Sequence, residues 1–219
     1  MRKYIVALTI LMFAANAYAD IIYVDANIDT TKVELPKDTY LDFPVKDGVL
    51  IAKYGDKIFV TPSEKPYSSI IIRTKKLSLR KGGAGDQPTI KVVGSGSAFC
   101  ILQQADSLTV EGIHFDLSDC KEAVSYFGLR TEWKAQNTKL IDCTWTKPKQ
   151  KNFDDVYSSR IAMTVKMIDV NAEYSNLTVT GSKFYNIKML SFEEKASGDS
   201  TIYSHNNIIS ALSAVEVSP

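Results

Sequence analysis

The sequence predicts an all-β chain built as a parallel β-solenoid, and three observations lead to that prediction. Short runs rich in Ile, Val and Tyr are bounded by Gly, Pro, Asp or Ser, which is the pattern of strands separated by turns. No amphipathic helical pattern separates these runs, which argues against a doubly wound α/β fold. The third observation is a repeat, because one short template returns several times along the chain.

The predicted strands of the N-terminal half are short. They span residues 21–24, 57–60, 69–73, 77–79 and 89–93. Residues 41–52 are the one segment where a helix is an alternative, because apolar residues recur there at every fourth position from Leu41. Gly48 lies inside this segment and disfavours a helix.

The repeat supplies the architecture. Its copies begin at Leu77, Leu108, Thr138, Leu177 and Thr201. Each copy carries alternating apolar positions, a Gly or polar turn, and an aromatic or aliphatic residue further on. Trp145 occupies the template position of Phe115 and Phe184, so we expect it in the core. Such a unit cannot bury its own apolar face; stacked copies form one continuous core, and the unequal spacings become loops.

The N-terminus has the pattern of a secretory signal peptide. Two basic residues open the chain, an apolar run follows at residues 4–15, and residues 17–19 supply a small-x-small cleavage pattern. The run is shorter than the ~20 apolar residues of a membrane span. We expect cleavage near Ala19, a mature chain that begins at Asp20, a secreted or periplasmic location and no membrane span after cleavage. The alternative is a buried N-terminal helix.

The charge balance and the cysteine content limit which partners, disulfides and metal sites are expected. Lys and Arg total 26 against 25 Asp and Glu, so no strong field is present that would attract nucleic acid. The three cysteines are Cys100, Cys120 and Cys143. An odd number allows one disulfide with a free thiol, or buried apolar side chains, and the pairing stays open. Their spacing matches no zinc motif.

Four segments carry a resemblance to a known family. They are residues 22–27, 55–62, 70–72 and 76–90. These segments resemble the opening strand and first coil of right-handed parallel β-helix proteins of the pectin-lyase-like superfamily. The resemblance implies a short right-handed parallel β-helix (solenoid) of about five to six coils. It implies little about the reaction, because this superfamily hosts lyases, hydrolases, epimerases and non-catalytic surface proteins.

The resemblance also implies a domain organisation. We expect a signal peptide at residues 1–19, an N-terminal strand and cap region at 20–60, and β-helix coils at 61–219. The capping helix that is usual in the family is not evident at residues 29–53, so the cap is expected to be remodelled. The sequence stops early in what reads as another coil. Because exposed coil ends promote aggregation, either a partner caps this end or the chain is a shortened relative of a longer protein.

A long polar insertion supplies the candidate site. The catalytic candidates are Lys147, Lys149 and Arg160, and the candidate calcium ligands are Asp154 and Asp155. A uronate lyase needs a base and a positive group that stabilises developing negative charge, commonly Ca²⁺, and arginine binds carboxylates bidentately. Trp133 and Tyr157 are candidate sugar-stacking side chains. The alternative is an ordinary solvated loop.

A second carboxylate group follows the repeat that begins at Leu108. It consists of Asp116, Asp119 and Glu122, with Asp142 at the turn of the next copy. Neighbouring copies that place these groups together would share a calcium ion. Local turn chemistry, in which Asp bonds nearby backbone, is the favoured alternative.

Three functional hypotheses remain. The first is an exported β-helix protein that binds an acidic polysaccharide and, in its enzymatic form, cleaves it as a lyase. The second is a non-catalytic surface or adhesin-like module that binds glycans or a protein partner. The third is a small β-sandwich of a secretion or conjugation apparatus followed by a partial solenoid, which residues 38–73 alone would permit.

Overall fold

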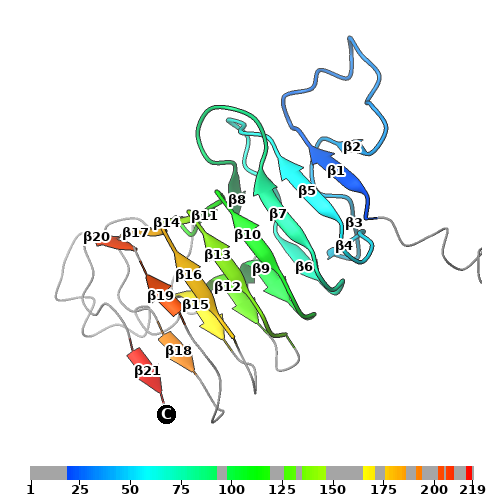
Figure 1. Cartoon of the computed structure of the whole chain (residues 1–219). Coiled ribbons are helices and arrows are strands. Elements are labelled where there is room, and N and C mark those ends of the chain that lie inside the picture. The colour runs from blue at the N-terminus through cyan, green and yellow to red at the C-terminus, as the bar shows by residue number, and fades with distance from the viewer. Residues whose placement is uncertain are drawn as a thin grey trace, which may run out of the picture.

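The structure is a computed structural model, and the part of the chain that it describes is entirely β (Figure 1). The described residues are 19–92, 98–118, 126–131, 135–146, 165–170, 176–185, 191–193, 202–204, 206–209 and 216–218. No helix occurs among them, which confirms the predicted all-β class. In this part of the chain no helix is long and apolar enough to cross a membrane.

The largest sheet, called here the long sheet, has eight strands in the order β19-β16-β13-β10-β7-β5-β1-β2. Its strands are β1 (Ile21–Val24), β2 (Thr39–Tyr40), β5 (Lys57–Val60), β7 (Ser78–Lys81), β10 (Thr109–Glu111), β13 (Lys139–Ile141), β16 (Thr178–Thr180) and β19 (Ile202–Ser204). Every pairing in this sheet is parallel.

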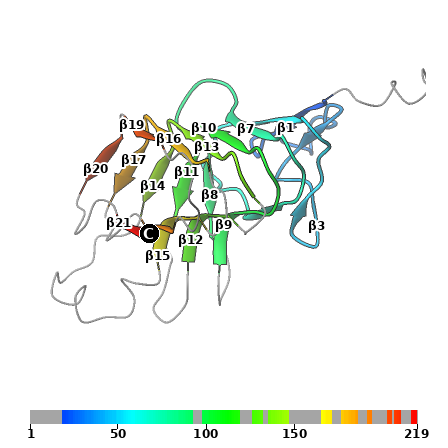
Figure 2. The ribbon, with the colours of Figure 1, turned by 60° about the horizontal axis from the view of Figure 1, so that its bottom comes forward.

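Two further sheets accompany it (Figure 2). The short sheet contains β8 (Thr89–Lys91), β11 (His114–Asp116), β14 (Thr144–Thr146), β17 (Lys183–Tyr185) and β20 (Asn207–Ile209). The third sheet contains β3 (Val45–Lys46), β4 (Val49–Leu50), β6 (Ile70–Ile72), β9 (Ala98–Gln103), β12 (Tyr126–Thr131) and β15 (Val165–Val170). A separate pair joins β18 (Ser191–Glu193) and β21 (Glu216–Ser218).

The chain visits the three sheets in rotation. Strands β7, β8 and β9 lie in the long, short and third sheets, and the sets β10–β12 and β13–β15 repeat that order. Neighbours within a sheet are therefore three strands apart along the chain, which requires parallel pairing through crossover connections.

The predicted repeat is confirmed in its register. Thr109 pairs with Ser78 on one side and Lys139 on the other, and the same row continues through Thr178 to Ile202. These residues are the second positions of the five copies that the sequence aligns. Because side chains alternate along a strand, the apolar positions that follow these residues in each copy all point to the same side of the sheet.

The predicted strands at 21–24 and 57–60 have the predicted bounds, whereas the others shift by one to two residues. The alternative of a helix at residues 41–52 is wrong. That segment forms the antiparallel hairpin β3–β4, with Asp47 and Gly48 at its turn. Their φ angles are +52° and +76°, and a two-residue hairpin turn of type I′ requires positive φ at both positions.

Left-handed residues mark one corner of each of the first four repeat copies. Lys76, Ser107, Asn137 and Asn176 each precede a copy and have φ angles of +58°, +65°, +56° and +42°. The Asn176 amide donates to the Asn137 side-chain oxygen at 3.1 Å, which links two successive corners. Because asparagine tolerates this conformation better than most residues, the corner composition agrees with the geometry.

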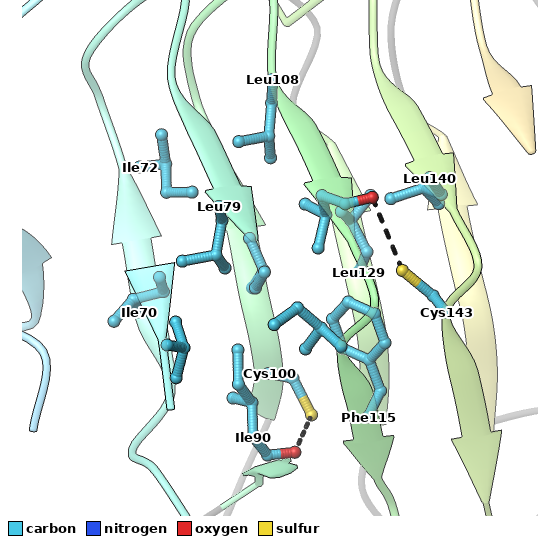
Figure 3. Close-up of a cluster of buried hydrophobic side chains, with 14 of the residues drawn as sticks. Ile70, Ile72, Leu79, Ile90, Cys100, Leu108, Phe115, Leu129, Leu140 and Cys143 are labelled. Carbon is cyan, nitrogen blue, oxygen red and sulfur yellow. Dashed lines mark hydrogen bonds between the residues drawn. The ribbon is translucent and has the colours of Figure 1, made fainter. Parts of the chain in front are cut away.

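The interior is a continuous apolar stack (Figure 3). Trp145 lies between Phe115 and Phe184, with ring centroids 4.7 and 4.6 Å apart and interplanar angles of 14° and 11°. All three side chains are fully buried. The predicted core position of Trp145 is confirmed, and stacked rings of this kind add to the free energy of apolar burial.

Two of the three cysteines, Cys100 and Cys143, are buried in this interior. The Cys100 thiol donates to the Ile90 carbonyl at 3.4 Å, and the Cys143 thiol to the Val110 carbonyl at 3.6 Å. Burial raises the pKa of Cys143 to about 12. Both therefore behave as small apolar side chains, while Cys120 lies outside the described residues.

Candidate functional site

The catalytic, calcium-binding and sugar-stacking candidates predicted from the sequence lie outside the described residues. They are Lys147, Lys149, Arg160, Asp154, Asp155, Trp133 and Tyr157. Asp119 and Glu122 of the second carboxylate group lie outside them as well. The described residues therefore provide the site on which a function is argued.

Asp116 and Asp142 are described, and Asp116 has local partners. Its carboxylate accepts from the Ser118 amide at 2.8 Å and lies 3.7 Å from the Lys91 ammonium. Asp142 occupies a left-handed corner with φ +50°, and its carboxylate fills the space where a side chain on Gly181 would lie. Among the described residues no three His, Cys, Asp or Glu side chains are grouped to hold a metal ion.

A different arrangement lies on the outward face of the long sheet. One row of this face consists of Tyr23, Phe59, Arg80, Glu111 and Ile141, which are direct neighbours on β1, β5, β7, β10 and β13. These positions alternate with buried ones along each strand, so their side chains face away from the core.

A groove of about 460 Å³ lies over part of this row. Its lining residues are Phe59, Arg80, Lys81, Gly83, Gln87, Glu111, Gly112 and Asp142. The connection between β7 and β8, residues 82–88, supplies one wall. The equivalent connections between β10 and β11 and between β13 and β14 are only two residues long, so they form no comparable wall.

Two side-chain contacts hold this wall in place. The Lys81 ammonium donates to the Gly85 carbonyl within the connection. The Gln87 side-chain amide donates to the Asp142 carbonyl of a later repeat. The wall is therefore tied both to the strand that precedes it and to the corner opposite.

Arg80 provides the groove with a positive charge that is only partly neutralised. Its Nη1 lies 3.4 Å from Glu111 Oε2, and its Nε donates to the Ser78 hydroxyl at 2.7 Å. The Arg80 and Glu111 side chains are 46% and 39% exposed, so the ion pair is screened by water. Among the described residues Nη2 makes no hydrogen bond or ion pair, so its N–H donors can serve a planar anion such as a carboxylate.

An aromatic pair continues the row beside Arg80. The rings of Tyr23 and Phe59 stack with centroids 5.9 Å apart and an interplanar angle of 23°. Tyr23 is 47% exposed. A partly exposed ring pair offers a flat apolar surface, to which a ligand with an apolar face and polar edges can add its own burial.

A second hollow, of about 360 Å³, lies at the other end of the same strands. It is lined by Lys76, Leu77, Ser78, Ser107, Thr109, Asn137 and Lys139. The Lys76 ammonium lies 5.3 Å from the centre of the Tyr54 ring. Lys139 has no ion-pair partner among the described residues, so this hollow is also positively charged.

The outward face of the short sheet has a different character. The ring nitrogens of His114 lie 3.0 Å from the Thr89 hydroxyl and 2.7 Å from the Thr146 hydroxyl. Burial lowers the pKa of His114 from its ordinary value, against an opposing effect of Asp116. With Lys91 paired to Asp116, the polar groups around His114 on this face bond one another.

Comparison with protein-family models, curated proteins and solved structures yields no match for this chain. The functional argument therefore depends on the geometry alone. Sequence reasoning missed Tyr23, Phe59, Arg80 and Glu111, although the alternation in the predicted strands carried the signal. Each lies at an outward position of a predicted strand or repeat copy, and the repeat alignment already places Arg80 beside Glu111.

Proposed function

We propose that this chain is an exported right-handed parallel β-helix that binds an acidic polysaccharide on the outward face of its long sheet. The observation that carries the proposal is the groove lined by Phe59 and by the partly exposed Arg80, beside which the Tyr23 ring stacks on Phe59. Sugar rings have apolar faces and polar edges, and uronates add a carboxylate. The groove offers a complementary group to each of these features.

The β-helix part of the proposal is supported by the order of the strands. The chain returns to the long, short and third sheets in the same sequence, and all pairings from β5 onward are parallel. The family resemblance noted above supports the right-handed sense and a length of about five to six coils.

The chemistry of binding assigns a role to each side of the groove. A uronate carboxylate is expected to bind the unused N–H donors of Arg80 and to compete with Glu111 for them. A sugar ring would then cover Phe59 and Tyr23 and exclude water from their exposed surface. Several weak contacts of this kind suit a polymer, since neighbouring units bind at a high effective concentration.

Binding does not require the lyase chemistry predicted for Lys147, Lys149 and Arg160. The groove is shallow and open, with both charged side chains of the Arg80–Glu111 pair in contact with water. Proton abstraction needs a base positioned within hydrogen-bond reach of the proton that it removes, and the predicted candidates for that role lie outside the described residues. The groove therefore supports binding, with cleavage as a separate activity to be measured.

The test is calorimetric titration of the purified protein with soluble polymers. Polygalacturonate and a glucuronate polymer are the acidic ligands, and a neutral glucan of similar length is the control. We expect binding to the acidic polymers alone, and weaker binding at raised ionic strength, because exposed charges are screened by salt. Equal binding of the neutral polymer, or no binding of any acidic polymer by the folded protein, would overturn the proposal.

The same samples measure cleavage. Ultraviolet absorbance reports the unsaturated sugar that a lyase produces, and the assay is run with and without Ca²⁺. An absorbance increase that is lost in Lys149→Ala or Arg160→Ala would assign lyase chemistry to the insertion. Binding without any absorbance change would identify a binding module.

A further inference from the structure

Asp20 is fixed in the structure through all three of its polar groups. Its backbone N lies 2.8 Å from Asp56 Oδ1, and its carbonyl accepts from the Lys57 amide at 3.0 Å. Its carboxylate pairs with the Lys53 ammonium at 2.7 Å. Asp20 immediately precedes β1, so these contacts fix the position at which the first strand joins the long sheet.

The acceptor of the Asp20 backbone N is unusual because it is a buried carboxylate. Asp56 is only 1% exposed, and its two oxygens accept from the backbone N of Asp20 and of Lys53, at 2.8 and 2.6 Å. A buried carboxylate is costly unless hydrogen bonds and a nearby positive charge compensate it. Two neutral amide donors supply the hydrogen bonds but carry no charge.

The sequence independently marks the same residue. The small-x-small pattern ends at Ala19, which makes Asp20 the first residue after the expected cut. Cleavage there would convert the Asp20 amide, which already bonds Asp56, into an α-ammonium group. The buried carboxylate of Asp56 and the group that would gain a positive charge are therefore in direct contact.

We propose that the Ala19–Asp20 bond is hydrolysed on export and that the new α-ammonium of Asp20 forms an ion pair with the buried carboxylate of Asp56. Water adds across the C–N bond, so Ala19 leaves with a carboxylate and Asp20 gains the protons of an ammonium. A hydrogen bond from a neutral amide to a carboxylate would become an ion pair between an ammonium and that carboxylate. This inference rests on export and is independent of the polysaccharide groove.

The position of Ala19 indicates when the cut takes place. A side chain on Gly55 would lie 3.3 Å from the Ala19 Cβ, so the scissile bond lies against the turn formed by Gly55 and Asp56. A protease requires an extended segment that is free of such contacts. Cleavage is therefore expected before β1 pairs with β5, and the ion pair then stabilises the docked strand.

The first experiment uses the protein recovered after export from cells that express the full chain. Intact mass and N-terminal sequencing are expected to give Asp20 as the first residue. The α-amine is then acylated at neutral pH under native and unfolding conditions. We expect the native α-amine to react at least about tenfold more slowly, because each unit rise in its pKa reduces the free amine tenfold.

Two variants separate the ion pair from general burial. Asp56→Asn removes the charge but keeps an oxygen acceptor, so the α-amine is expected to become as reactive as in the unfolded chain. Asp20→Ala removes the contact with Lys53 but keeps the α-amine and Asp56, so protection is expected to persist.

If Asp56→Asn does not fold, the α-amine of the native exported protein is methylated with an isotopically labelled reagent, and its pKa is measured by NMR titration. Its pKa is expected above the ordinary value of about 8. A different first residue overturns the proposal. So does an α-amine that reacts or titrates as it does in the unfolded chain.

Discussion

The outward faces of the long sheet and the short sheet are built on the same repeat but differ in how far their polar side chains bond one another. On the short sheet, His114 bonds two threonine hydroxyls and Lys91 pairs with Asp116. On the long sheet, Arg80 keeps donors directed to solvent beside the exposed ring of Tyr23.

The difference teaches where a ligand can gain free energy. A ligand over His114 on the short-sheet face would have to replace hydrogen bonds that the protein already makes, and leaving one of those groups unpaired is costly. A ligand on the long-sheet face meets the Arg80 side chain, which is 46% exposed, and Tyr23, which is 47% exposed. The repeat that builds both faces is the same, so the outward residues alone decide which face binds.

The largest expected effect comes from a substitution in the interior, which supports both faces. Trp145→Ala deletes the middle ring of the Phe115–Trp145–Phe184 stack and leaves a cavity. We expect a loss of about 3–5 kcal/mol in the free energy of unfolding, measured by urea denaturation. Trp145→Phe keeps a stacked ring and also removes an indole N–H that has no acceptor among the described residues, so its loss should be much smaller. Equal losses would show that the stack contributes little.

The second prediction tests the charge difference between the faces. Arg80→Ala removes the guanidinium of the groove, and a hydrogen bond to a charged group contributes about 1.5–3 kcal/mol. Binding of polygalacturonate is therefore expected to weaken about tenfold to a hundredfold by calorimetry. Lys91→Ala removes a cation from the short-sheet face and is expected to leave the affinity unchanged. Comparable losses in both variants would mean that overall charge, not the groove, attracts the polymer.

The third prediction tests the aromatic pair. Tyr23→Ala deletes an exposed ring that stacks on Phe59, and its loss is expected to weaken polymer binding about threefold to tenfold. The matched control is Tyr185→Ala, which removes a partly exposed aromatic ring from the short-sheet face. Both affinities are measured by titration with the same polymer sample. Unchanged affinity in Tyr23→Ala would remove the ring pair from the binding surface.

The smallest expected effect belongs to the short-sheet face and concerns pH. Burial lowers the pKa of His114 below its ordinary value of 6.5, so the unfolded chain binds the proton more readily than the folded chain. The stabilising contribution is fully present above pH 6.5 and is lost as the pH falls toward the lowered pKa. Thermal unfolding across this window should therefore show a decline that is weaker in His114→Gln, with polymer binding at neutral pH unchanged. An identical decline in both proteins would mean that another group titrates.

Much of the fold could be predicted because the repeat is explicit in the sequence. The aligned copies pair in the predicted register, and the position of Trp145 in the core followed from its place in the template. The prediction was weakest at residues 41–52, where spacing suggested a helix and the Asp47-Gly48 turn decided for a hairpin. Local turn chemistry outweighed periodicity there because two successive left-handed residues cannot continue a helix.

The candidate site was harder to predict because the polar composition of residues 147–160 made that insertion the most conspicuous candidate. Residues such as Lys149 and Asp154 are conspicuous in sequence, whereas Phe59 and Arg80 are ordinary members of predicted strands. What unites Phe59 and Arg80 is a cross-strand neighbour relation, which depends on register rather than on distance along the chain. The wall of the groove at residues 82–88 could not be predicted, since nothing in its composition states which face it borders.

The connections between the long and short sheets are the part of the repeat whose length can vary. Where two residues join the long and short sheets, the sheet face is flat, and where residues 82–88 make the same connection, it acquires a rim. Both connections start and end at the same places in the stack, so the length of a corner can change without disturbing the interior. Lengthening or shortening residues 82–88 would therefore change the depth of the recess without changing the core. Replacing residues 112–113 with a connection of similar length would create a second recess one repeat further along.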